Sequence, residues 1–380
     1  MKTLGLYVHI PFCESKCTYC DFNSGYQLEE DHYLKALLRE LEMYAATFSN
    51  HVVDTLFFGG GTPSLYSEKS LESIWSHIKK LFQLKQNYEA TIECNPNSLT
   101  LEKLKKLKAS GFNRISLGAQ SFDEQQLKNL TRLHGSNHIK EALKNIREAQ
   151  FTNFSFDLMY GLPDQDLKGF MSDLETALTF HPPHFSFYNL TLSATHPLFK
   201  RLPTNEVCAT MHVRAEKILK KHGYEHYEIS NYAKSGFQCQ HNLKYWENHE
   251  YLGVGAGASS HLKTPPPWAE KEMPYGVRFQ NKKLPSNYTS LILNHSFPTE
   301  NIEYPTQKQA MTDYLIGYLR LNKDLPVSSL NKLYDIDFLN LYEKTIQKHK
   351  KLHLLDIKEN VLSLSDKGRL YLDEILIDFV

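Results

Sequence analysis

No charge of either sign dominates this sequence, in which 43 Lys and Arg residues balance 43 Asp and Glu residues. The basic excess that marks a nucleic-acid surface or a polybasic membrane surface is therefore missing. No apolar run reaches the ~18 residues of a membrane-spanning helix, and the N-terminus shows no signal-peptide cleavage site. We expect neither a nucleic-acid partner nor an integral membrane segment.

Cysteine is scarce, with six residues in 380, yet Cys13, Cys17 and Cys20 fall within eight positions. Clustered free thiols suit a reducing cytosol better than a secreted disulfide framework, so we expect a cytoplasmic location. Three such thiolates can converge on one soft metal centre and leave one ligand position open. A zinc knuckle completed by His9 or His32 is the alternative, but zinc motifs usually pair two C-x2-C units, which favours an iron–sulfur cubane with one free iron.

Short β-rich runs alternate with helix-patterned segments from Leu4 to about Tyr232, which is typical of βα units around a parallel sheet. The predicted strands are 4–10, 52–58, 90–94, 114–118, 155–160, 184–190 and 224–229. The predicted helices lie near 29–48, 68–84, 100–109, 136–149, 168–180 and 205–222. Six or seven units are too few for a closed eight-unit barrel, so an α/β fold with a partial (β/α)6-type parallel barrel is predicted.

The composition shifts after Ala233, which predicts a core over 1–233, a connector over 234–304 and a C-terminal domain over 305–380. Glycines and a proline run indicate irregular structure in the connector. Beyond it, helix patterns near 306–321, 328–334 and 338–351 precede strands at 353–357 and 360–364 and a closing helix. This order predicts a smaller, mostly helical, winged-helix-like domain.

A glycine turn, Gly59-Gly60-Gly61-Thr62-Pro63, follows the second predicted strand and would let a ligand approach backbone N–H groups closely. Together with the segment from Tyr7 to Cys20, this turn resembles the radical S-adenosylmethionine (SAM) superfamily. Within it, the sequence is similar to the oxygen-independent coproporphyrinogen III oxidase-like family, on the branch that includes the haem chaperone HemW. The resemblance covers about the first 260 residues.

The resemblance implies that Cys13, Cys17 and Cys20 hold a [4Fe-4S] cluster and that SAM chelates the fourth iron. One electron could then split SAM into methionine and a 5′-deoxyadenosyl radical. The positions that match the family's SAM contacts are Tyr7, Tyr19, Gly60, Gly61, Thr62, Glu93, Gln120, Arg132 and Asp157. Structural roles remain open for some of them, such as a loop cap for Glu93 or a solvated cation for Arg132.

A further segment, His241-Asn242-x2-Tyr245-Trp246, matches the H-N-x2-Y-W motif of the haem chaperone. Imidazole ligates haem iron and flat aromatic rings stack on porphyrin. On residue types alone, an aromatic cluster that docks the connector is the alternative, and the resemblance favours haem. Cys239 and His261 are the other candidate iron ligands, since the family's usual Ala-His-Gly is replaced here by Ala258-Ser259-Ser260-His261.

Phe22 stands where the coproporphyrinogen III dehydrogenase has a further cysteine, and that enzyme also carries an N-terminal extension, whereas this sequence starts twelve residues before Cys13. Both departures favour a haem chaperone that delivers haem to acceptor proteins. The first alternative is the coproporphyrinogen III dehydrogenase itself, which performs oxidative decarboxylation in porphyrin biosynthesis. The second alternative is a zinc-stabilised α/β binding module. The partners implied are haem, haem-accepting apoproteins such as respiratory enzymes, and a reductant for the cluster. The sequence leaves open whether the protein forms a homodimer.

Overall fold

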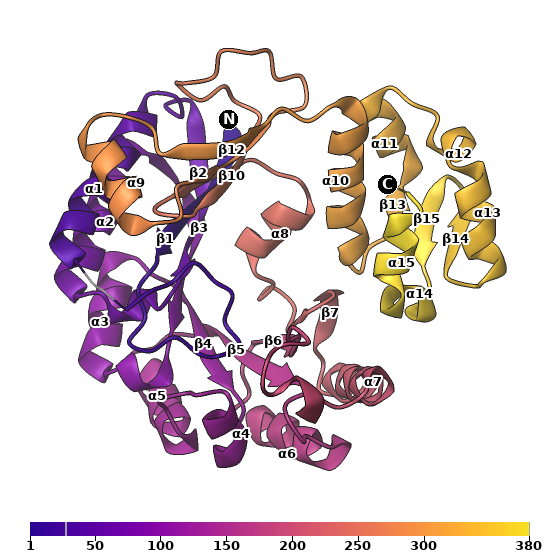
Figure 1. Cartoon of the computed structure of the whole chain (residues 1–380), viewed down its shortest axis with the longest axis horizontal. Coiled ribbons are helices and arrows are strands. Elements are labelled where there is room, and N and C mark those ends of the chain that lie inside the picture. Colours follow the sequence, from indigo (N-terminus) through magenta and orange to yellow (C-terminus); the bar gives the residue numbers. More distant parts are fainter. Residues whose placement is uncertain (27–28, 380) are drawn as a thin grey trace.

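A computed structural model describes residues 1–26 and 29–379 (Figure 1). Six parallel strands stand side by side in chain order, and a helix follows each of them. The strands are β1 (Lys2–Ile10), β2 (His51–Gly60), β3 (Gln83–Cys94), β4 (Arg114–Gln120), β5 (Asn153–Tyr160) and β6 (His184–Asn189). The long helices after them are α1 (Glu30–Ala45), α2 (Glu68–Leu81), α3 (Leu101–Ser110), α5 (Ser136–Glu148), α6 (Leu167–Leu178) and α7 (Asn205–Lys221), with the short α4 (Glu124–Asn129) before α5. The predicted partial parallel barrel is confirmed.

Helix α2 shows how the local sequence produces this pattern. Ser67 caps its N-terminus by accepting a hydrogen bond from the Ser70 N–H group. Leu71, Ile74, Trp75 and Ile78 recur at spacings of three and four residues and are all buried. The helix therefore packs one apolar face on the sheet and leaves its lysines in water.

The strand predicted at 224–229 forms, but not as another parallel unit. Strands β7 (Glu225–Glu228) and β8 (Asn231–Ala233) make a hairpin, and β8 pairs antiparallel with β6. The chain reverses directly after β7 instead of entering a helix, so of the six or seven parallel units predicted the structure has six.

The prediction of irregular structure over 234–304 was wrong. This segment contains α8 (Gln240–Trp246), β9 (Tyr251–Val254), β10 (Ser259–Leu262), β11 (Val277–Asn281), α9 (Pro285–Leu293) and β12 (Thr299–Glu303). Strand β9 pairs parallel with the free edge of β1, and β10 to β12 continue the sheet antiparallel. The segment therefore extends the sheet beyond β1 and covers the edge that β1 would otherwise expose.

A buried carboxyl group holds this extension to the core. Glu40 of α1 accepts hydrogen bonds from the Gly255 N–H group (2.8 Å), the Tyr288 hydroxyl (2.6 Å) and the Asn281 amide (2.7 Å). Burial disfavours the carboxylate and raises the pKa of Glu40 to about 7, although these hydrogen bonds oppose the shift.

Glu40 should therefore give the protein a pH-dependent stability. Its pKa rises on folding from 4.5 to about 7, so its contribution is full below pH 4.5 and is lost as the pH rises through 7. Glu40→Gln does not titrate. Between pH 4.5 and about 8, the free energy of unfolding of this variant should gain on the order of 3 kcal/mol relative to wild type. Urea denaturation of both proteins across this range measures the difference, and a difference independent of pH would contradict the assignment.

The C-terminal region forms its own hydrophobic core. Its helices are α10 (Gln307–Arg320), α11 (Val327–Tyr334), α12 (Phe338–Leu341), α13 (Glu343–Lys351), α14 (Asp366–Leu370) and α15 (Leu372–Ile377). Strands β13 (Leu325–Pro326), β14 (Leu355–Lys358) and β15 (Val361–Leu364) form a small antiparallel sheet. This is the predicted winged-helix-like arrangement, except that the single helix expected at 338–351 breaks at Tyr342 and the closing helix is divided in two.

Helix α8 lies between the sheet and α10, as Figure 1 shows. The approach to α10 is close, because a Cβ added to Gly317 would lie 2.6 Å from the Trp246 carbonyl oxygen. None of the helices that the structure describes is both long and apolar enough to cross a membrane.

Candidate functional site

The three clustered cysteines lie in the loop that follows β1, and hydrogen bonds anchor this loop. The Cys13 N–H group donates to the Gly25 carbonyl (2.9 Å), and the Cys20 N–H group donates to the Cys17 carbonyl (3.1 Å). The Asn23 amide donates to the carbonyls of Ala256 (3.0 Å) and Lys283 (2.9 Å), two residues that are far from Asn23 in sequence. All three cysteines remain partly exposed. The loop therefore presents its thiols while its backbone is held in place.

Two side chains donate hydrogen bonds to the sulfurs. The Thr62 hydroxyl lies 3.6 Å from Cys13 Sγ, and Arg132 Nη1 lies 3.5 Å from Cys17 Sγ. Asn95 links these two donors, because its amide nitrogen donates to Thr62 (3.2 Å) and its oxygen accepts from Arg132 (2.6 Å). Donors of this kind stabilise thiolates over thiols, which is what a metal centre requires.

Backbone hydrogen bonds join the glycine turn to the start of the cysteine loop. The N–H groups of Gly61 and Thr62 donate to the carbonyls of Ile10 and Phe12, each at 2.8 Å. A Cβ on Gly61 would lie 2.6 Å from the Phe12 carbonyl oxygen, so a side chain there would collide with backbone. The Gly60 N–H group donates to Glu93 at 3.1 Å. Close approach between the two loops thus requires glycine.

A cavity of about 340 Å³ adjoins the cysteines. The predicted residues that line it together with Cys13, Cys17 and Cys20 are Tyr19, Gly60, Gly61, Thr62, Glu93, Gln120, Arg132 and Asp157. They come from the ends of four strands and from the loops after them. Gln120 ends β4 in the left-handed region, at a φ of 67°. The structure therefore gathers into one cavity positions that lie up to about 145 residues apart in sequence.

Two half-buried carboxyl groups, those of Glu93 and Asp157, face this cavity. Burial and the nearby Asp157 raise the pKa of Glu93 to about 8. Burial also raises the pKa of Asp157, although the Ser116 hydroxyl donates to both of its oxygens, at 3.1 and 2.9 Å. A cationic ligand would lower both pKa values, because it favours the charged form of each carboxyl group. The cavity therefore suits a ligand with a positive centre.

Tyr7 lies outside the cysteine cavity. It lines a neighbouring cavity of about 290 Å³ that shares Glu93 and Asp157 with the first and is bounded by Asn242 and Tyr245 of α8. Its hydroxyl lies 2.9 Å from His9 Nδ1, and His9 Nε2 lies 2.9 Å from the Asn23 carbonyl oxygen. Tyr7 thus connects the cysteine loop to α8.

His241 and Cys239 are both buried. His241 Nδ1 lies 2.9 Å from the Thr55 hydroxyl and Nε2 lies 2.8 Å from the Tyr245 hydroxyl, so both ring nitrogens have protein partners. Burial lowers the pKa of His241 to about 3 and raises that of Cys239 to about 12. Glu89 accepts from the N–H groups of Gln240 and His241, each at 3.1 Å, and fixes the start of α8.

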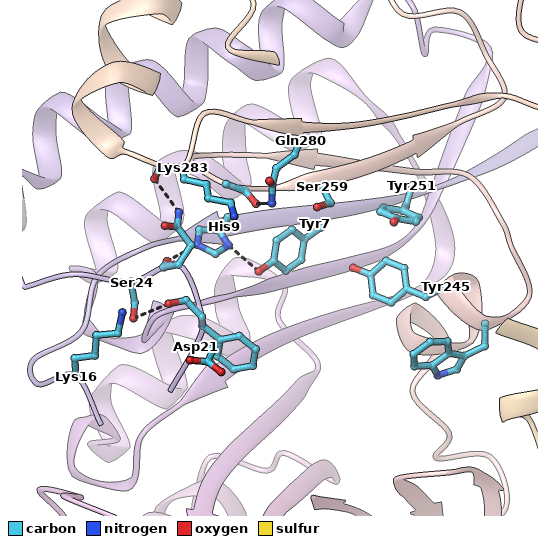
Figure 2. Close-up of a pocket in the computed structure, with 14 residues that line it drawn as sticks. Tyr7, His9, Lys16, Asp21, Ser24, Tyr245, Tyr251, Ser259, Gln280 and Lys283 are labelled. Atoms are coloured by element: carbon cyan, nitrogen blue, oxygen red, sulfur yellow. Dashed lines mark hydrogen bonds between the residues drawn. The ribbon is translucent and has the colours of Figure 1, made fainter. Parts of the chain in front are cut away.

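A groove of about 610 Å³ opens beside the cysteine loop (Figure 2). Its aromatic lining consists of Tyr7, Phe22, Tyr245, Trp246 and Tyr251, and its basic residues are Lys16 and Lys283. The side chain of Phe22 is 68% exposed, which is unusual for a large apolar residue. His261 does not line this groove and is buried against Tyr251.

The described part of the chain contains no group of three His, Cys, Asp or Glu side chains arranged to hold a single metal ion.

Residues 7–177 match the family described as the Radical SAM superfamily. The chain is 33% identical over 388 aligned positions to "Heme chaperone HemW" of Buchnera aphidicola subsp. Acyrthosiphon pisum, and the match covers 100% of this chain and 99% of the relative. The chain belongs to the HemW family of radical SAM proteins. It is also 39% identical to "Heme chaperone HemW" of Escherichia coli over 70% of this chain and 72% of that protein.

Among solved structures, the Escherichia coli coproporphyrinogen III oxidase HemN, described as a radical SAM enzyme, superimposes on this HemW-family chain with a TM-score of 0.86 at 25% identity. The superposition covers 100% of this chain and 90% of HemN. The similarity therefore includes the C-terminal region as well as the parallel sheet.

A radical SAM domain implies a [4Fe-4S] cluster and SAM, and this HemW-family chain has residues that fit both. Three thiols with polar donors at two sulfurs suit an iron–sulfur cluster. The two carboxyl groups that face the cavity suit a ligand that carries positive charge.

Several residues of the site escaped the sequence analysis. Asn95, which connects Thr62 to Arg132, lies within the same motif as Glu93 and could have been found there. Lys16 and Lys283 both line the groove, but they are far apart in sequence and no sequence signal links them. The bond between His241 and Tyr245 did have a signal, because residues four apart share one face of a helix.

Proposed function

We propose that this protein is a haem chaperone that binds haem, a [4Fe-4S] cluster and SAM and delivers haem to acceptor proteins. The observation that carries the proposal is the match over 100% of the chain to a protein named as a heme chaperone. The groove beside the cysteine loop also supports the proposal, because aromatic residues and two lysines line it. A flat apolar macrocycle with two propionates suits such a lining.

In this proposal Cys13, Cys17 and Cys20 hold three irons of the cluster, and the cationic Arg132 offsets part of its negative charge. Glu93 and Asp157 face the positive centre of SAM, and Gly60 and Gly61 line the same cavity. When bound, the reduced cluster can supply one electron to the sulfonium. The chain's own residues position the two groups and limit the access of water.

Oxidative decarboxylation of coproporphyrinogen III is the second candidate. The superposition on the oxidase HemN over the whole chain favours it, as does the complete set of cavity residues. Phe22, which stands where the enzyme has a further cysteine, favours the chaperone.

Assays on one anaerobic preparation of reconstituted protein distinguish these candidate functions. The chaperone should bind haemin stoichiometrically, transfer it to an apo-acceptor such as apo-cytochrome, and form no tetrapyrrole product from coproporphyrinogen III with SAM and reductant. Product above control would establish the enzyme instead. A colourless protein that contains zinc but no iron or sulfide would leave only the zinc-stabilised binding module.

A further inference from the structure

The interior of the partial barrel is polar, although parallel barrels are usually filled by branched apolar side chains. Arg114 and Ser116 of β4, Asp157 of β5 and Ser186 of β6 line the cavity of about 290 Å³ that adjoins Tyr7. We call it the lumen cavity. Polar groups enclosed in this way need partners, which are either water or a bound molecule.

Arg114 is the one positively charged residue among the described residues that line the lumen cavity. Only 2% of this residue is exposed. Its Nε atom is buried, and no described residue accepts a hydrogen bond from it. The ion pairs that arginines form in the described part of the chain do not include Arg114. A buried charge is normally paired, so this guanidinium lacks the partner that its burial requires.

The chemistry of Arg114 indicates which partner it would take. Burial acts against its charged form, but neighbouring acidic groups, Cys239 and Glu89 first among them, raise the pKa of the guanidinium, so it stays charged. A planar guanidinium presents paired N–H donors that match the two oxygens of a carboxylate. The Ser186 hydroxyl and the Asn242 amide line the same cavity and can donate to the same group.

The two carboxyl groups at the boundary with the cysteine cavity do not prevent this. Burial and Asp157 raise the pKa of Glu93 to about 8, so Glu93 is mostly uncharged at pH 7, and a nearby carboxylate would raise this pKa further. Asp157 accepts hydrogen bonds from the hydroxyls of Ser116, at 3.1 and 2.9 Å, and of Ser155, at 3.4 Å. Arg114 is therefore the charged group of the lumen cavity that still lacks a partner.

We propose that the lumen cavity binds a small carboxylic acid in its ionised form and that Arg114 holds the carboxylate. The volume lies at the lower end of the roughly 300–1,000 Å³ of small-molecule sites, so it suits a ligand much smaller than a tetrapyrrole. The rings of Phe57 and Tyr188 offer apolar surface to the rest of the ligand. Ser116, Asp157 and Tyr188 also line the cysteine cavity, from which the ligand enters. The proposal stands independently of haem binding in the groove.

A matched pair of probes tests the site. The acid is 4-bromobenzoate, and 4-bromobenzamide is its uncharged counterpart of the same shape. Titration calorimetry measures the binding of both to wild type, Arg114→Met and Arg114→Lys. Wild type should bind the acid at least about 10-fold more tightly than the amide, which corresponds to 1.4 kcal/mol. Arg114→Met should lose this preference, and Arg114→Lys should keep only part of it, because an ammonium lacks the paired donors.

Lys244→Met is the matched control. Lys244 is also a buried cation, but it pairs with Asp54 at 2.8 Å and lies outside the lumen cavity. This variant should keep the wild-type preference for the acid. Crystals of wild type soaked with 4-bromobenzoate should show the anomalous signal of bromine in the lumen cavity, and excess SAM should not displace it.

Four results would overturn the proposal. They are equal binding of acid and amide by wild type, an unchanged preference in Arg114→Met, bromine in the cysteine cavity with displacement by SAM, and wild type that binds neither probe and holds only water at Arg114. The wild-type comparison and the bromine position need no variant, so they decide the question even where Arg114→Met does not fold. The haem chaperone proposal has its own test in haemin binding and transfer, and none of these results changes it.

Discussion

Replacing Cys17 by alanine should reduce the iron of anaerobically reconstituted protein to background while the secondary structure stays intact. Cys17 lies in a partly exposed loop, so its truncation removes a ligand without opening a core cavity. A [4Fe-4S] cluster held by three thiolates has no ligand to spare, and the loss of one exposes a second iron to water. Iron and sulfide analysis, the visible absorption of the cluster and far-UV circular dichroism measure the result.

Cys94→Ala is the matched control. Cys94 lines the same cavity, but it is buried, and burial raises its pKa to about 12, so it should not act as a thiolate ligand. This variant should keep the wild-type iron content. A Cys17→Ala protein that retains its iron, or a Cys94→Ala protein that loses it, would contradict the three-cysteine assignment.

Gly255→Ala should lower the free energy of unfolding by about 2–5 kcal/mol, which is large for the addition of a single methyl group. Gly255 follows β9 at a φ of +104°, a conformation that costs an L-residue roughly 1–2 kcal/mol. A Cβ there would also lie 2.5 Å from the His9 carbonyl oxygen and 2.8 Å from the Tyr33 hydroxyl, and overpacking adds about 1–3 kcal/mol. Tyr33 donates to the His9 carbonyl and accepts from the Ala256 N–H group, so the collision disturbs both bonds.

Gly236→Ala separates the two contributions to this loss. Gly236 also has a positive φ, at +83°, but nothing lies within 4 Å of the position of its Cβ. It should therefore lose only the conformational part, about 1–2 kcal/mol. Urea denaturation of both variants measures the difference, and equal losses would show that the packing between Gly255 and β1 is looser than the structure indicates.

The sequence predicts the six parallel strands well, because each contains an apolar stretch and is followed by a helix with its own apolar face. It fails for β9 to β12, which have only four or five residues each. Strand β9 is stabilised by pairing with β1, a partner far away in sequence, and local composition carries no trace of such a pairing. The hairpin of β7 and β8 was missed because β8 has only three residues.

The residues of the site also fall into two groups, those that the sequence predicts and those that it does not. Residues within motifs, such as Glu93 and Arg132, could be singled out from the family resemblance, and the structure places them in one cavity with the cysteines. The direction of a side chain could not be assigned. His241 was predicted at a haem edge; its ring is buried, with Nδ1 2.9 Å from the Thr55 hydroxyl, whereas Tyr245, one turn further along α8, lines the groove. Residue type indicated the chemistry of this segment but not which of its side chains reaches the groove.

The position of β1 between β2 and β9 has a consequence for synthesis on the ribosome. One edge of β1 can pair with β2 soon after both emerge, but its other edge waits for β9, about 240 residues later. At ~5–20 residues per second, translation of that stretch takes on the order of 10–50 s. Asn23 must also wait, since Ala256 and Lys283 follow it by 233 and 260 residues. The nascent chain therefore carries an open strand edge and an unanchored cysteine loop during this interval, when its thiols are most accessible to cluster delivery and to oxidation.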